Sequence, residues 1–65
     1  MVFSEADVVR MVVRACEQEG DIAFATRAGV SRQYVYDVRR GNRAPGPKIL
    51  RALGLRKTWR YERLK

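Results

Sequence analysis

Small residues at a fixed spacing between Asp21 and Gly41 constrain this chain more than any other feature. Ala25 stands where two helices can cross closely, because a larger side chain would hold them apart. Gly29 follows four residues later, where a chain that turns between two helices needs a positive φ. Ser31 is a good N-cap for the next helix, and Gly41 is a good exit from it. The pattern predicts a helix-turn-helix; an ordinary helical hairpin with a glycine turn is the alternative.

The residues that hold this pair of helices together are small and apolar. The first helix is expected to begin at Asp21, whose side chain can cap it, and to turn Ile22, Ala25 and Ala28 to one side. The second helix is expected to face the first through three valines: Val30, Val35 and Val38.

A further helix is expected before this pair. Ser4 and Asp7 have the spacing of a capping box, so this helix should begin near Glu5. Valines follow at helical spacing as far as Gly20, which supplies the stop. Cys16 lies on the apolar side of the pattern and is expected as a buried, reduced thiol.

The last part of the chain changes its pattern. Pro47 suits the first turn of a fourth helix, and Gly54 suits the left-handed residue after its end. In residues 56–65, Trp59 and Tyr61 alternate with polar side chains, which is the period of a strand. We therefore expect an all-α fold of four to five short helices in residues 1–55, followed by a short C-terminal β-strand.

Charge is divided unequally along the chain. Residues 1–25 carry a net charge of −3 and residues 26–65 a net charge of +10, which together give the net +7 of the 65-residue sequence. Eleven of the 14 basic side chains are arginine, whose planar fork suits phosphate groups and guanine edges. A basic face of this kind favours a polyanionic partner.

Other functions have little to be built from. The chain has no histidine and one cysteine, so we expect no catalytic residue, metal, cofactor or small-molecule ligand, and no enzymatic activity. No segment reaches the roughly 18 apolar residues of a membrane span, and no secretory signal is evident. We therefore expect no membrane partner and a cytoplasmic location.

The helix-turn-helix pattern and its continuation also carry a family resemblance. The residues concerned are Ala25-x3-Gly29-Val30-Ser31-x3-Val35-x2-Val38-x2-Gly41-x-Arg43-x-Pro45 and then Leu50-x2-Leu53-Gly54-Leu55. Over about residues 21–55 they resemble the Cro and lambda-repressor family of phage and bacterial regulators. The resemblance implies a helical bundle that represses transcription by binding operator DNA, on the nucleoid of a bacterial or phage-infected cell. It also implies that bases are read from the second motif helix, by Arg32, Gln33, Tyr36 and Asp37.

The chemistry of these four side chains agrees with base reading. Arg32 can fork onto guanine and Gln33 can pair with adenine, each contact discriminating by about 1 to 3 kcal/mol. Tyr36 can press on a thymine methyl or reach a phosphate, or it only shields the helix. Asp37 can accept from cytosine or brace Arg40, and bracing is favoured because an acid beside phosphates is costly unless paired.

Further polar and basic side chains flank the second motif helix, where the DNA backbone would pass. The predicted phosphate contacts are Ser31, Arg39, Arg40, Asn42, Arg43 and Lys48. One feature departs from the family. Many members open the motif with a glutamine that bonds a phosphate, whereas this chain has Asp21, which would repel one.

A palindromic operator needs two recognition helices about 34 Å apart, so a homodimer is expected. The C-terminal strand is the predicted interface, with Tyr61 on the two-fold axis and Arg60 facing Glu62 of a second copy. The competing possibility is that this strand folds back on residues 1–3 of its own chain. The predicted interface residues are Thr58, Trp59, Arg60, Tyr61, Glu62 and Arg63.

The sequence thus predicts a sequence-specific regulator that binds a double-stranded DNA operator as a dimer. Two alternatives stay open. One is an antitoxin-like interaction protein that also binds DNA, and the other is a non-specific nucleic-acid binder.

Overall fold

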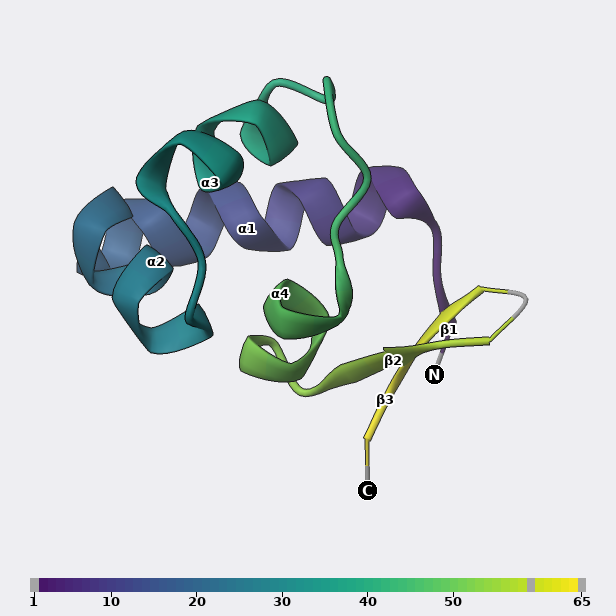
Figure 1. Ribbon diagram of the computed structural model, residues 1–65. Coiled ribbons are helices and arrows are strands. Elements are labelled where there is room, and N and C mark those ends of the chain that lie inside the picture. Colours follow the sequence, from purple (N-terminus) through teal and green to yellow (C-terminus); the bar gives the residue numbers. More distant parts are fainter. Residues whose placement is uncertain (1, 59, 65) are drawn as a thin grey trace.

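Four helices and a small sheet make up the computed structural model, which describes residues 2–58 and 60–64 (Figure 1). The helices are α1 (Glu5–Glu19), α2 (Asp21–Ala28), α3 (Arg32–Arg39) and α4 (Pro47–Ala52). The strands are β1 (Val2–Phe3), β2 (Leu55–Lys57) and β3 (Tyr61–Arg63). The helices gather around one core, and the sheet lies at one end of them beside both chain termini. The prediction of a mostly helical fold is confirmed.

Local signals set the ends of α1 and α4. Ser4 accepts a hydrogen bond from the backbone N–H of Asp7, whose carboxylate accepts one from the Ser4 N–H, so the predicted capping box is present. α1 ends at Gly20, whose φ of 93° is open to glycine but strained for other residues. Pro47 occupies the first turn of α4, where its missing N–H costs nothing.

The turn between α2 and α3 is built as the glycine spacing predicts. Gly29 has a left-handed φ of 75°, and its N–H donates to the carbonyl of Thr26 at 3.2 Å. The next N–H, from Val30, donates to the carbonyl of Ala25 at 3.0 Å, which completes a Schellman motif. Ser31 then caps α3 by accepting from the Tyr34 N–H at 3.0 Å.

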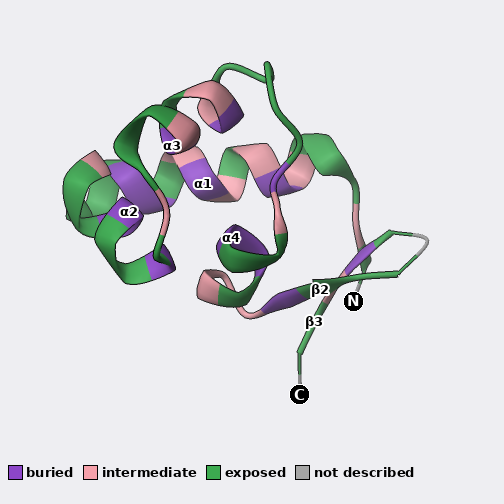
Figure 2. Ribbon diagram, in the orientation of Figure 1, coloured by how far each residue is buried: buried purple, intermediate pink, exposed green. Residues whose placement is uncertain are grey.

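The core lies where the four helices meet, and Figure 2 shows the buried residues on their facing sides. Val12 of α1, Phe24 of α2 and Val35 of α3 are fully buried there. Cys16 is also buried, as predicted, and burial raises the pKa of its thiol to about 11. The thiol is therefore protonated at neutral pH and is a poor nucleophile.

The inner face of α2 differs from the prediction. Ile22 is 64% exposed, whereas Phe24 is fully buried together with Ala25 and Ala28. Asp21 does not cap α2 either, because Gly20 occupies the N-cap position and Asp21 is the first helical residue. In a helix of eight residues two apolar stripes fit the same period, and the crossing with α1 and α3 selects the one containing Phe24.

The sheet is antiparallel, in the order β1-β3-β2. Phe3 pairs with Tyr61 on one side, and Lys57 pairs with Tyr61 on the other. Tyr61 is 5% exposed and packs with Val8 and Leu55 in a second apolar cluster under the sheet. The sheet therefore covers the end of the core at the N-terminal part of α1.

The prediction of a single free strand at the C-terminus is wrong. Residues 55–63 form two strands, and β1 occupies the other edge of β3. Pairing of Tyr61 across a two-fold axis is not available in this fold, because both edges of β3 are already paired within the chain. The competing possibility, in which the strand folds back on the start of its own chain, is the one observed, with Val2 and Phe3 as the paired residues. Trp59 lies outside the described residues.

The sheet should contribute strongly to stability through Tyr61. We expect Tyr61→Ala to lower the free energy of unfolding by about 3 kcal/mol, because it removes a buried aromatic ring. Tyr61→Phe is the matched control; it loses only the hydroxyl that donates to Glu5 at 3.3 Å and should cost under about 1 kcal/mol. Urea unfolding followed by circular dichroism measures both changes, and equal effects would contradict the role assigned to the ring.

Candidate nucleic-acid interface

α3 divides its residues between the core and the surface. Val35 and Val38 are fully buried, and they fix the rotation of the helix about its axis. On the opposite side Arg32 and Gln33 are exposed, and Tyr36 is 46% exposed. In the described part of the chain no hydrogen bond or ion pair occupies the Arg32 guanidinium. Three of the four predicted base-reading residues therefore lie together on the surface.

Two pairs of side chains one helical turn apart organise this exposed face. The Gln33 side-chain amide donates to Asp37 Oδ1 at 3.1 Å. Arg40 donates to the Tyr36 hydroxyl at 2.8 Å, and its guanidinium lies 5.4 Å from the centre of the Tyr36 ring. Asp37 is thus braced by Gln33 instead of Arg40, which corrects the favoured prediction. Arg40 does not reach Asp37 because its guanidinium packs against the Tyr36 ring and donates to the Tyr36 hydroxyl.

An open hollow lies beside the exposed face of α3. Its walls combine the start of α2 with Arg32, Gln33 and Tyr36 of α3. Ile22 and Ala23 supply apolar surface there, next to the polar side chains of Arg32 and Gln33. Ile22 was missed as a surface residue because the sequence pattern assigned it to the core.

Arg39, one of the predicted phosphate contacts, forms an ion pair inside the chain. Its guanidinium donates to both carboxylate oxygens of Asp21, at 2.9 and 3.0 Å, and both side chains are about one-third exposed. This ion pair joins the start of α2 to the end of α3. Asp21 therefore neutralises Arg39, and Arg39 acts in holding the two motif helices together.

Arg27 makes a second ion pair that sequence reasoning missed. It donates to both carboxylate oxygens of Glu19, at 2.9 and 3.0 Å, and to the carbonyl of Ala52 at 2.8 Å. Its guanidinium also lies 5.2 Å from the centre of the Phe24 ring. The hydrogen bonds from Arg27 lower the pKa of Glu19. Arg27 thus links α1, α2 and α4. Because its charge is neutralised by Glu19, the count of basic side chains overstates the positive charge that is left for a partner.

The loop from α3 to α4 is held by Tyr34, another residue that the sequence did not single out. The Tyr34 hydroxyl donates to the carbonyl of Ala44 at 3.3 Å, and the Arg43 guanidinium lies 5.5 Å from the ring centre. Gly46 passes so close that an added Cβ would lie 2.5 Å from the Tyr34 hydroxyl oxygen. Arg43 is therefore presented from an anchored loop.

The remaining predicted phosphate contacts lie around the two ends of α3. The Asn42 N–H donates to the carbonyl of Asp37 at 2.9 Å, next to Gly41 with its left-handed φ of 78°. Lys48 donates to the carbonyl of Gly29 at 3.4 Å. Ser31 uses its side-chain oxygen to cap α3.

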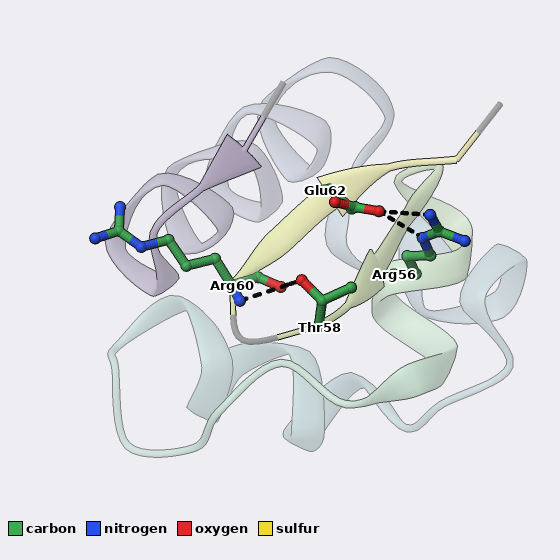
Figure 3. Close-up of polar contacts among 4 residues, drawn as sticks. All are labelled: Arg56, Thr58, Arg60 and Glu62. Atoms are coloured by element: carbon green, nitrogen blue, oxygen red, sulfur yellow. Dashed lines mark hydrogen bonds and ion pairs between the residues drawn. The ribbon is translucent and has the colours of Figure 1, made fainter.

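The described members of the predicted C-terminal interface make contacts inside the chain. Glu62 accepts from Arg56 at 2.5 and 2.8 Å, as Figure 3 shows. The Thr58 hydroxyl donates to the carbonyl of Arg60 at 2.9 Å and closes the turn between β2 and β3. The Arg63 guanidinium lies 5.6 Å from the centre of the Phe3 ring. Glu62 therefore already has a cationic partner.

Within residues 2–58 and 60–64, no three potential metal ligands cluster, and no helix has the length and apolar character to cross a membrane. Comparison with known proteins gave no matching family model and no significantly similar curated protein or solved structure.

The closeness of Gly46 to Tyr34 gives a double-mutant test of the loop anchor. We expect Gly46→Ala to lower the free energy of unfolding by about 1 to 3 kcal/mol, because the new methyl forces the Tyr34 hydroxyl to move. In a Tyr34→Phe background the same change should cost little, since the next ring atom is 3.6 Å away. Chemical denaturation of the four proteins measures this coupling, and additive effects would contradict the anchor.

Proposed function

We propose that this chain is a sequence-specific, double-stranded-DNA-binding transcriptional regulator, a repressor or autoregulator of the Cro-like type that acts in the cytoplasm on the nucleoid. The observation that carries the proposal is α3, which buries Val35 and Val38 and presents Arg32, Gln33 and Tyr36 outward. A major groove about 12 Å wide admits one α-helix with its side chains.

The side-chain hydrogen bonds along α3 support different roles for its exposed residues in reading bases. Arg32 keeps its guanidinium for the fork onto guanine O6 and N7. Gln33 and Asp37 act as one unit, because their hydrogen bond orients the amide and leaves its Oε1 as an acceptor. Such acceptors suit the exocyclic amino group of adenine or cytosine. Tyr36 and Ile22 add apolar surface suited to a thymine methyl.

Cations flanking α3 support the backbone contacts. Arg40, Arg43 and Lys48 are exposed around the helix and its following loop, and their partners are a hydroxyl, aromatic rings or a backbone carbonyl instead of a carboxylate. They therefore keep their charge for phosphate groups. Arg39 does not contact phosphate in this arrangement, because Asp21 neutralises it.

We also propose that two copies occupy a palindromic operator. The molecule measures 28 × 24 × 18 Å and presents one α3, whereas the half-sites of such an operator lie about 34 Å apart. The contact between copies must use a surface other than the edges of β3.

Salt dependence tests whether phosphate contacts drive binding. We expect the logarithm of the association constant to fall linearly with the logarithm of salt concentration, by about 0.9 for each phosphate neutralised. Fluorescence anisotropy with duplex DNA from the region flanking the gene measures the slope. Random duplex DNA is the control for sequence preference; equal affinity for both would favour the non-specific binder, and a flat salt response would contradict DNA binding altogether.

Substitutions separate base reading from positioning. Arg32→Ala or Gln33→Ala should weaken operator binding by about 1 to 3 kcal/mol with little change on random DNA, while Arg43→Ala should weaken both alike. Arg14→Ala is the matched control for charge, since Arg14 lies on α1 in a separate hollow beside Arg10 and Asp7. Uniform losses for Arg32, Gln33 and Arg43 on both DNAs would contradict reading by α3.

A further inference from the structure

The hollow between α2 and α3 places apolar surface beside an arginine. Ile22 of α2 and Tyr36 of α3 line it together with Arg32. Ile22 is 64% exposed, more than any other large apolar side chain among the described residues. Removing such a side chain from water on binding is favourable. This surface is therefore suited to an apolar group that lies next to the group bound by Arg32.

The guanidinium of Arg32 is free on its edge and on both faces. Arg32 is the first residue of α3, and within the described residues it has no hydrogen bond, ion pair or ring contact. A guanidinium that forks onto guanine O6 and N7 uses the N–H groups at its edge. The faces of its plane stay uncovered, and they accept apolar contact because a guanidinium is weakly hydrated. An apolar group beside the guanine can thus touch both Arg32 and Ile22.

DNA presents such a group in the major groove as the methyl on carbon 5 of a pyrimidine. This methyl lies on the outer side of the base, next to the backbone of its own strand. A side chain on α2, at the flank of the recognition helix, is therefore well placed to reach it. When the pyrimidine is on the 5′ side of a guanine, the twist of the duplex brings its methyl against the arginine that forks onto that guanine.

Two carboxylates on the same hollow make it unsuitable for a phosphate group. Glu19 and Asp21 line its other side. Each is held by an arginine, in the pairs Glu19–Arg27 and Asp21–Arg39. A phosphate in the hollow would meet carboxylate oxygens and would find only Arg32 as a free cation. An uncharged methyl group meets no such repulsion.

We propose that this hollow binds the 5-methyl group of a pyrimidine on the 5′ side of the guanine that Arg32 reads. The inference rests on the proposed function and extends it to regulation, because cytosine carries this methyl group only after DNA methylation. At a cytosine–guanine step, methylation of the cytosine therefore strengthens binding. At a thymine–guanine step the methyl group is always present. Ile22 is thus a specificity-determining residue outside α3.

The test uses the duplex that the full chain selects from a randomised library of double-stranded DNA. The guanine read by Arg32 is the one at which Arg32→Ala no longer discriminates between bases. Four duplexes then differ only at the preceding pyrimidine of one half-site, which is thymine, uracil, 5-methylcytosine or cytosine. Thymine with uracil, and 5-methylcytosine with cytosine, are pairs that differ by one methyl group. We expect the methylated member to bind about threefold to fivefold more tightly in fluorescence anisotropy, as burial of one methyl predicts.

Ile22→Ala separates contact with the methyl group from a general loss of affinity. We expect it to lower both affinity ratios to below about twofold, because most of the apolar surface around the methyl is removed. Val2→Ala is the matched control, since Val2 is an apolar side chain on β1 that is 46% exposed. It should leave both ratios unchanged. Each ratio compares two duplexes with the same protein, so an effect on folding cancels.

Several outcomes would overturn the inference. Equal affinities within both pairs, while Arg32→Ala still loses discrimination at its guanine, remove the methyl contact and leave base reading by α3 intact. A preference for thymine over uracil without one for 5-methylcytosine removes the dependence on methylation. Ratios that survive Ile22→Ala remove the role of Ile22. If the library gives no preferred duplex, the proposed function itself is contradicted, and the inference falls with it.

Discussion

The position of α3 depends on the burial of Val35 and Val38 against the other helices. A helix of eight residues is too short to be stable alone in water, so its inner face must pack for it to exist. Burial of each of these valines contributes about 1.5 to 3 kcal/mol to the free energy of folding. Phe24 and Val12 belong to the buried cluster against which α3 packs. The same packing points Arg32 outward. Stability and the proposed recognition therefore rest on one arrangement.

Ion pairs inside the chain decide which cations remain for a partner. Three of the acidic side chains bind an arginine far along the chain or on another element, in the pairs Glu19–Arg27, Asp21–Arg39 and Glu62–Arg56. These pairs link elements and remove their arginines from the charge that a polyanion meets. The surface around α3 keeps Arg32, Arg40 and Arg43.

Helix ends were predictable because their signals act within a few residues. Ser31 and Gly29 set the turn through hydrogen bonds that span three to five residues. Contacts such as that of Arg27 with Ala52, which are 25 residues apart, leave no local pattern. Ile22 was assigned to the core for a related reason, since an eight-residue helix does not define its own buried side.

The sequence alone determined where the helices begin and end and which residues α3 can present, because caps, glycine φ angles and apolar spacing are local. It also showed the strand period at the C-terminus. Only the tertiary structure decided what that strand pairs with. A period of two is equally compatible with a second copy and with the chain's own start, and hydrogen bonds between strands depend on which backbone lies nearby. Here Phe3 lies next to Tyr61 because the capped start of α1 brings the N-terminus beside it, so the pairing closes within one chain.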